Sequence, residues 1–260
     1  MEQRGKVGRW TAGATVMALA MFAGACGTND RTGRSDSAAS GSVGQQTTTT
    51  PPSTDNTPVE PVRSATRRVV LLGTSLTAGL GLDPALAYPA LLQRKADSAG
   101  FGVTIVNAGL SGETSAGALR RAGWVLDQPA ALVVLEVGAN DGLRGVDPDS
   151  TYANLLALVN VVQAQRPEAA IALMQMEAPT NLGRGYTTRF HDAYGRVARE
   201  TGVPLLPFLL EGVAGDARFN QADGIHPNPD GSKRVAETVW RGLAPLLAAA
   251  GTSGGSTARR

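Results

Sequence analysis

The chain has 260 residues, which is enough for one α/β domain of ordinary size with appended segments. Its formal net charge is only +2, and its arginines are scattered along the chain, so the sequence carries no electrostatic footprint for nucleic acid. Cys26 is the only cysteine, which excludes an intramolecular disulfide.

The first 26 residues have the pattern of an export signal. Three basic residues lie within the first nine positions, and the apolar stretch TAGATVMALAMFAGA follows at 11–25. A basic start, a short apolar core and small residues before a cleavage site are typical of signal peptides. The stretch is too short to span a bilayer comfortably, so a retained membrane helix is disfavoured. We therefore expect a protein exported to the cell envelope.

Cys26 directly follows FAGA, an arrangement that resembles the lipobox of bacterial lipoproteins, in which this cysteine becomes the lipidated first residue. A large aliphatic residue is usual where Ala23 stands. Ala23-Gly24-Ala25 also fits the A-x-A site of ordinary signal peptidase, so a periplasmic or secreted protein without lipid stays open. We predict lipid on Cys26 and attachment to a bacterial membrane.

Residues 27–65 are rich in Ser, Thr, Gly and Pro and have almost no large apolar side chains. Such a segment cannot bury enough apolar surface to offset the entropy lost on ordering. We predict a disordered tether that joins the cysteine to one folded domain at 66–250. The tail at 251–260, GTSGGSTARR, is also predicted to be disordered.

Five apolar runs alternate with helix-like stretches in the predicted domain. The runs are RVVLLG (68–73), VTIVNAG (103–109), ALVVLEVG (131–138), AAIALMQM (169–176) and VPLLPFL (203–209). The helix-like stretches occupy 88–100, 115–129, 150–167, 187–202 and 232–251. Runs that are apolar throughout are typical of parallel strands covered on both faces. The alternation predicts an α/β fold, a three-layer α/β/α sandwich around a five-stranded parallel sheet.

Polar turns follow the first three runs, and a fourth polar turn precedes the last helix. They are Gly73-Thr74-Ser75, Asn107-Ala108-Gly109, Gly138-Ala139-Asn140-Asp141 and Asp223-Gly224-Ile225-His226. Functional groups of such sheets collect at the carboxyl ends of the strands. We expect the four turns to meet there.

Ser75 is the candidate nucleophile of this set, and a serine needs a base within hydrogen-bond reach. Of the two histidines, His191 lies among polar residues of a predicted helix and is expected at the surface. His226 follows Asp223 by three residues, so the carboxylate can fold back onto one ring nitrogen and leave the other facing Ser75. The plain alternative is that Asp223 and His226 only build a turn.

A developing oxyanion needs hydrogen-bond donors, and three candidates are present. They are the backbone N–H groups of Ser75 and Gly109 and the side-chain amide of Asn140. The alternatives are an ordinary turn glycine and an ordinary turn asparagine. Asp141 is expected to be structural and to bond neighbouring backbone. Four large side chains are predicted to pack in the core: Trp124, Trp240, Met174 and Met176.

These blocks resemble, in order, those of the SGNH (GDSL-type) hydrolase superfamily, with Ser75, Gly109, Asn140 and His226 as the named residues. The segments NAGLSGETSAGALRR, GANDGLRG, VPLLPF and DGIHPN are similar to the bacterial multifunctional esterase branch, which includes thioesterases, lysophospholipases and arylesterases. The similarity covers about 68–247. It implies a flavodoxin-like SGNH fold. The family usually has Asp at the position of Thr74, and Thr keeps a hydrogen-bonding oxygen without the charge.

The resulting hypothesis is an exported serine esterase that hydrolyses small-molecule or lipid esters through an acyl-enzyme and needs neither metal nor cofactor. The stretches at 142–149 and 176–186 are predicted to wall the acyl pocket. A carbohydrate O-deacetylase of the same fold stays open. A non-catalytic binding lipoprotein would be expected to have lost a triad member. A flavin or phosphate binder could use GTSLTAG as an anion nest, but it leaves Asp223 and His226 unexplained. The oligomeric state is not predicted.

Overall fold

The structure is a computed structural model, and it describes residues 67–253. The predicted export signal (1–26), the predicted lipidation residue Cys26 and the predicted tether (27–65) lie outside the described residues. The last helix runs to Ser253, so helix replaces the first three residues of the predicted disordered tail. Within the described part of the chain, no helix is long and apolar enough to cross a membrane.

Five parallel strands form one sheet in the order β2-β1-β3-β4-β5, which confirms the predicted fold class. The strands are β1 (Arg67–Gly73), β2 (Val103–Gly109), β3 (Leu132–Glu136), β4 (Ala170–Met174) and β5 (Leu205–Leu206). The chain turns from β1 to β2 on one side and then crosses back to β3 on the other. This reversal places a switch point at the carboxyl end of β1, where open α/β sheets hold their functional groups.

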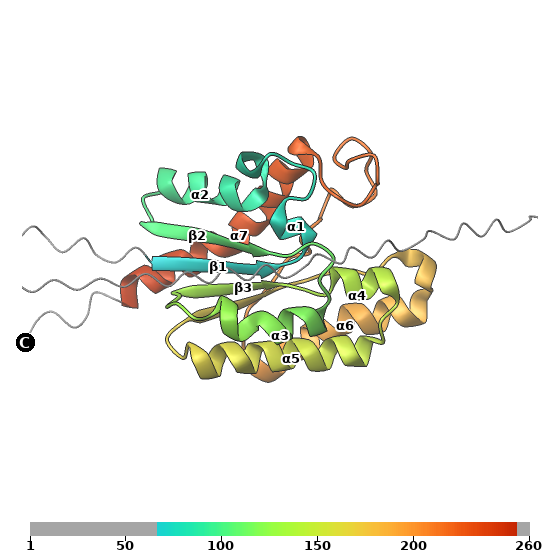
Figure 1. The fold of residues 1–260 in the computed structure, drawn as a ribbon, viewed down its shortest axis with the longest axis horizontal. Coiled ribbons are helices and arrows are strands. Elements are labelled where there is room, and N and C mark those ends of the chain that lie inside the picture. Colours follow the sequence, from blue (N-terminus) through green and yellow to red (C-terminus); the bar gives the residue numbers. More distant parts are fainter. Residues whose placement is uncertain (1–66, 254–260) are drawn as a thin grey trace, which may run out of the picture. The chain divides into compact units, whose positions relative to one another are not determined.

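Helices cover both faces of the sheet (Figure 1). One layer contains α2 and α7, and the other contains α3, α5 and α6. The helices are α1 (Ser75–Ala78), α2 (Tyr88–Ser98), α3 (Ser115–Val125), α4 (Ala139–Arg144), α5 (Pro148–Gln165), α6 (Arg184–Thr201) and α7 (Pro229–Ser253), with 3₁₀ turns η1 (Pro84–Leu86) and η2 (Thr180–Leu182). The short helices α1 and α4 start directly beyond β1 and β3, so they lie at the carboxyl edge of the sheet.

The core lies between the sheet and the two helical layers. The segment from Val69 to Leu72 in β1 is fully buried, as expected for a central strand covered on both faces. On the α6 side, Phe190 packs edge-on against Tyr194, and both are fully buried. The fifth predicted strand, 203–209, is reduced to the two residues of β5, because Pro204 and Pro207 flank them and cannot donate to a ladder.

The prediction that Trp124 packs in the core is wrong, because its relative exposure is 79%. The buried positions of α3 are Ser115, Ala118 and Ala122, which recur at helical spacing. Trp124 comes two residues after Ala122 and therefore points away from that stripe. The other three predictions are confirmed: Met174 and Met176 are buried, and Trp240 packs against the core from a partly buried position.

Candidate active site

The turn that follows β1 presents Ser75 as the first residue of α1. Thr74 is the N-cap, and its hydroxyl accepts a hydrogen bond from the Leu76 N–H at 3.4 Å. Gly73 allows the turn to pack closely, because a Cβ there would lie 2.1 Å from the Thr77 hydroxyl oxygen. Ser75 itself retains 8% of its accessible surface. The local sequence therefore holds a nearly buried hydroxyl at the end of a central strand.

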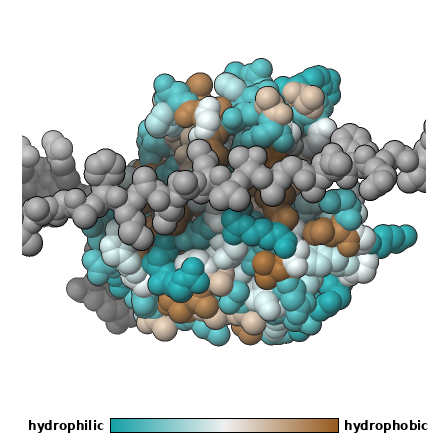
Figure 2. Space-filling view, turned by 45° about the vertical axis from the view of Figure 1, so that its right-hand side comes forward, coloured by the Kyte–Doolittle hydropathy of each residue, from teal (hydrophilic) through white to brown (hydrophobic). Residues whose placement is uncertain are grey.

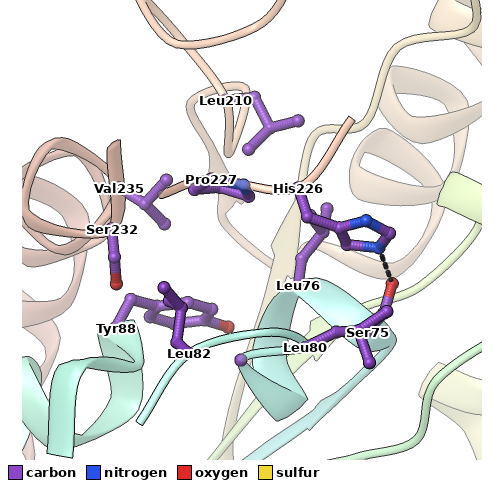
Figure 3. Close-up of a pocket in the computed structure, with 11 residues that line it drawn as sticks. Ser75, Leu76, Leu80, Leu82, Tyr88, Leu210, His226, Pro227, Ser232 and Val235 are labelled. Atoms are coloured by element: carbon purple, nitrogen blue, oxygen red, sulfur yellow. Dashed lines mark hydrogen bonds between the residues drawn. The ribbon is translucent and has the colours of Figure 1, made fainter. Parts of the chain in front are cut away.

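The imidazole of His226 faces the hydroxyl of Ser75, as the dashed line in Figure 3 shows. Nε2 of His226 lies 2.9 Å from Oγ of Ser75, and Nδ1 lies 2.6 Å from Oδ2 of Asp223. An ionised carboxylate only accepts hydrogen bonds, so Nδ1 donates to Asp223 and Nε2 is left as an acceptor for the serine proton. The structure thus brings all three residues of the predicted triad into one hydrogen-bonded line.

Asp223 is held in this position by its own turn. Its Oδ1 accepts the N–H groups of Ile225 at 2.9 Å and of His226 at 3.0 Å, while Oδ2 faces the ring of His226. These hydrogen bonds, first among them that of the His226 backbone, lower the pKa of Asp223 to about 2. The carboxylate is therefore ionised at neutral pH and fixes the orientation of the imidazole.

The side chain of Gln221 joins the loop of His226 to the segment that follows α1. Its Nε2 donates to the carbonyl of Leu80 at 2.7 Å and to that of Pro227 at 3.0 Å. Its backbone N–H donates to the carbonyl of His226 at 2.7 Å. The segments that carry the nucleophile and the base are far apart in the chain, and Gln221 connects them directly. No feature of its sequence position drew attention to this residue.

Asn140 lies in the first turn of α4 and lines the same groove as Ser75. Its Nδ2 donates to the carbonyl of Glu113 at 3.0 Å, which fixes the amide with one N–H still available. The neighbouring Asp141 is structural, as expected, although its partner is distant in sequence. Its carboxylate accepts the N–H of Ser115 at 2.8 Å and the Ser115 hydroxyl at 2.5 Å, at the start of α3.

Gly109, the third predicted oxyanion donor, is not brought to this groove. Its N–H already donates to Oδ1 of Asn107 at 2.9 Å, and it borders a separate surface cavity beside Trp124. A Cβ at Gly109 would lie 2.2 Å from the backbone nitrogen of Ala78, so the glycine serves the close approach of β2 to α1.

Gly112 is the glycine that lies beside Asn140, in the loop between β2 and α3. The next residue, Glu113, supplies the carbonyl bonded by Asn140, and the Gly112 carbonyl accepts from Arg144 at 3.0 Å. Gly112 has a φ of 78°, and its N–H has no hydrogen-bond partner among residues 67–253. In the sequence, Gly112 stands in the S-G-E-T turn, a position that a glycine at the end of a strand, such as Gly109, resembles.

An open groove of about 700 Å³ begins at Ser75 and Asn140. Both predicted wall segments contribute to it, as do two stretches near 208–215 and 224–225 that were not predicted as walls. The apolar lining includes Leu143, Met176, Leu182, Phe208, Leu210 and Ile225. Figure 2 shows hydrophobic patches, in brown, among hydrophilic side chains on the face of the molecule that it draws. His191 lies at the surface, as predicted, paired with Glu177 at 2.7 Å.

A second, very small cavity lies on the other side of His226. Its volume is about 10 Å³, close to the size of one water molecule. Leu82, Tyr88 and Val235 are among the side chains that close it (Figure 3). The large groove is therefore the only one of these two compartments next to Ser75 with room for an extended chain.

The fold, a three-layer α/β/α sandwich, and this site define a hydrolase of the SGNH type. The sequence profile of the GDSL-like lipase/acylhydrolase family matches residues 71–234. Esterase TesA of Pseudomonas aeruginosa is 40% identical over 186 residues, which are 71% of this chain and 92% of that protein. Thioesterase 1/protease 1/lysophospholipase L1 of Escherichia coli is 39% identical over 185 residues, 71% of this chain and 86% of that protein.

Solved structures agree with this assignment. The psychrotrophic esterase EstA from Pseudoalteromonas sp., in a structure inhibited by monoethylphosphonate, is 34% identical. It superimposes with a TM-score of 0.66 over 70% of this chain and 98% of that protein. The chain belongs to the GDSL-like lipase/acylhydrolase family and is a carboxylic ester hydrolase by class.

Proposed function

We propose that this protein is a serine esterase in which Ser75 is the nucleophile, His226 the general base and Asp223 the residue that orients His226. The hydrogen-bonded line from Asp223 through His226 to Ser75, with distances of 2.6 and 2.9 Å, is the observation that carries the proposal. A base that is fixed in this tautomer can take the serine proton as the hydroxyl attacks a carbonyl.

The reaction proceeds in two halves. Oγ of Ser75 forms a bond to the ester carbonyl carbon, and its proton passes to Nε2 of His226. The bond to the alcohol oxygen then breaks, His226 returns the proton to the leaving alcohol, and an acyl-serine remains. Water attacks this acyl group with His226 again as the base, and the acid and free Ser75 are released. Asp223 stays ionised throughout and stabilises the imidazolium.

The oxyanion of each tetrahedral intermediate needs donors that are already in place. We assign the N–H of Ser75, which has no partner inside α1 because it is the first residue of that helix, and the free N–H of the Asn140 amide. The N–H of Gly112 is the third donor in this proposal, in place of Gly109. Its support is its free N–H and its position beside Asn140.

The substrate class follows from the groove. Its volume of about 700 Å³ and its leucine, methionine and phenylalanine lining suit the acyl chain of a lipid-type ester. The names of the two relatives above include esterase, thioesterase and lysophospholipase, which supports an acyl ester or thioester as substrate. We propose that medium and long acyl chains lie along this groove, with the carbonyl at Ser75.

The place of action is proposed from the sequence alone. We propose that residues 1–26 direct export, that Cys26 is lipidated, and that 27–65 holds the hydrolase domain off the membrane. Mass spectrometry of the mature N-terminus tests this directly. A diacylglyceryl-modified Cys26, lost in Cys26→Ala, is the expected result, and an unmodified N-terminus at Cys26 would contradict the lipid anchor.

The experiment that tests the proposed activity is hydrolysis of p-nitrophenyl esters, from acetate to palmitate, by the full chain. Ser75→Ala is expected to abolish turnover of every ester. Ser98→Ala, at an exposed serine at the end of α2, is the matched control and is expected to keep wild-type rates. Turnover that persists in Ser75→Ala would contradict the serine mechanism.

A further inference from the structure

Glu136, the last residue of β3, is a fully buried carboxyl group that the proposed mechanism does not use. It lies in register with Gly73 of β1, so it sits directly beside the turn that presents Ser75. Burying a carboxyl group is costly unless its oxygens are hydrogen-bonded. The partners of Glu136 therefore show what this position contributes.

Among the described residues, every hydrogen-bond partner of the Glu136 carboxyl group belongs to the nucleophile turn, residues 74–77. Oε2 accepts the backbone N–H of Thr74 at 2.8 Å and the Thr77 hydroxyl at 2.7 Å. The Thr74 hydroxyl lies 3.0 Å from Oε1 and 3.1 Å from Oε2. Thr74 and Thr77 flank Ser75 on its two sides. One carboxyl group therefore binds the residues on both sides of the nucleophile.

The packing around this contact leaves little freedom. A Cβ on Gly73 would lie 2.5 Å from Oε2 of Glu136, so the carboxyl group occupies the space beside that glycine. The Thr77 hydroxyl also lies 2.6 Å from the hydroxyl of Tyr88 on α2. Tyr88 can donate to Thr77 while Thr77 donates to Glu136, which extends the network into the helical layer.

The groups that surround the Glu136 carboxyl group are hydrogen-bond donors and neutral phenols. Burial raises its pKa to about 7, and the hydrogen bonds from Thr74 and Thr77 hold it below the value that burial alone would give. The neighbouring phenols of Tyr88 and Tyr194 are neutral, because burial raises their pKa values. Arg121 on α3 donates to the Gly73 carbonyl at 3.2 Å, and its charge is paired with Glu113.

We propose that Glu136 is a positioning residue for the nucleophile: its carboxylate, through Thr74 and Thr77, fixes the hydroxyl and the N–H of Ser75 in their reactive geometry. This inference rests on the proposed role of Ser75. It also gives a use to the hydroxyl of Thr74, because that oxygen donates to Glu136 while it caps α1. The ionised carboxylate can accept all three hydrogen bonds, whereas a protonated Glu136 requires one threonine hydroxyl to accept instead of donate, so the ionised form holds the turn best.

The test measures kcat and KM of the full chain for p-nitrophenyl butyrate, together with the thermal unfolding midpoint. Glu136→Gln keeps the shape but places amide hydrogens against donors. It is expected to lower kcat about tenfold to a hundredfold with KM unchanged, as for a displaced reacting group. Thr74→Val, which removes one partner hydroxyl, is expected to lower kcat in the same way, and Thr74→Ser to restore it.

Two further readouts separate positioning from a general loss of stability. The double variant Thr74→Val/Glu136→Gln is expected to lose less than the product of the two single losses, because both changes remove the same contact. The fall in kcat/KM below pH 7 is expected to contain one ionisation fewer in Glu136→Gln than in the wild type. A purely structural role would change the unfolding midpoint and leave the shape of this profile as it was.

Each outcome decides between the two proposals. If Ser75→Ala still hydrolyses the ester, the proposed function fails. If Ser75→Ala is inactive while folded Glu136→Gln keeps the wild-type kcat and pH profile, only the role of Glu136 is overturned. Should Glu136→Gln fail to fold, the threonine pair carries the test, and equal kcat values for Thr74→Val and Thr74→Ser would overturn the inference.

Discussion

At the scale of single residues, the site depends on how Asp223 holds His226. The carboxylate accepts two backbone N–H groups and the ring Nδ1, so the turn from 223 to 226 fixes its own tautomer. Asp223→Asn keeps this shape but offers an amide that can donate to Nδ1, so Nε2 becomes protonated and cannot accept from Ser75. We expect kcat to fall about ten-thousandfold, by analogy with the same change in other triads.

Rates on p-nitrophenyl butyrate measure this effect, and the two histidines provide a matched pair of variants. His226→Ala is expected to lose activity as severely as Asp223→Asn, whereas His191→Ala at the surface is expected to retain it. Equal losses in both histidine variants would show that the decrease does not come from the triad.

In the proposed mechanism the amide of Asn140 makes a separate contribution, because its role there is to stabilise charge in the transition state and it takes no proton. Asn140→Ala is expected to lower kcat about a hundredfold to a thousandfold while KM changes little. The measurement is the full Michaelis–Menten curve for the variant and the wild type. A higher KM with an unchanged kcat would assign Asn140 to substrate binding rather than to the oxyanion.

Ser75, Asp223, His226 and Asn140 could be placed from the sequence because each lies in a polar turn next to an apolar run. The sequence alone does not separate Gly109 from Gly112, because a glycine that ends a strand can serve packing or catalysis equally well. Only the occupied N–H of Gly109 and the positive φ of Gly112 separate these roles. The sequence does not reveal the role of Glu136, because a single glutamate only interrupts an apolar strand and its hydrogen-bond partners are more than fifty residues away.

At the scale of elements, the active-site geometry depends on two short helices that sequence patterns do not reveal. α1 has four residues and α4 has six, which is too short for a helical repeat of apolar positions to emerge. The long helices and the four longer strands were predictable because their periodicity or apolar content spans the whole element. The predicted length of β5 is too great, because its apolar run includes two prolines.

The connection between the nucleophile segment and the base loop gives a prediction at this scale. Gln221→Ala removes the hydrogen bonds from its side chain to the Leu80 and Pro227 carbonyls. We expect kcat to fall about tenfold, because the loop of His226 is then less firmly held against α1. Gln93→Ala, at another hydrogen-bonded glutamine on α2, is the control and is expected to keep its kcat.

The wall that α4 contributes to the groove gives a second prediction. Leu143→Trp fills part of the space next to Asn140, so kcat/KM for palmitate esters is expected to fall relative to that for butyrate esters. Leu86→Trp changes a comparably exposed leucine in η1 and is the control. An unchanged ratio between the two esters in Leu143→Trp would place the acyl chain elsewhere.

At the scale of the whole molecule, the titration of Glu136 links stability to pH. Its pKa in the folded protein is about 7, above the ordinary value of 4.5, so the folded state binds more protons between these values. The free energy of unfolding is therefore expected to decrease as pH rises from 4.5 through 7. Asp223 acts in the opposite direction at lower pH, since its stabilisation is lost as pH falls from 3.8 towards 2.

Thermal unfolding of the full chain at pH 4.5 and pH 8 measures the contribution of Glu136. The wild type is expected to lose more stability between these two values than Glu136→Gln, because glutamine does not titrate. Parallel changes in both proteins would assign the pH dependence to other groups.

Ser75 is proposed to form the covalent intermediate, and trapping it with a reagent that mimics the ester is the decisive experiment. The full chain is treated with a fluorophosphonate ester, digested and examined by mass spectrometry. One phosphonyl adduct is expected on the peptide that contains Ser75, formed in the wild type and absent from Ser75→Ala and His226→Ala. An adduct on another residue, or an unlabelled Ser75 in a protein that still hydrolyses esters, would contradict the proposed role of Ser75.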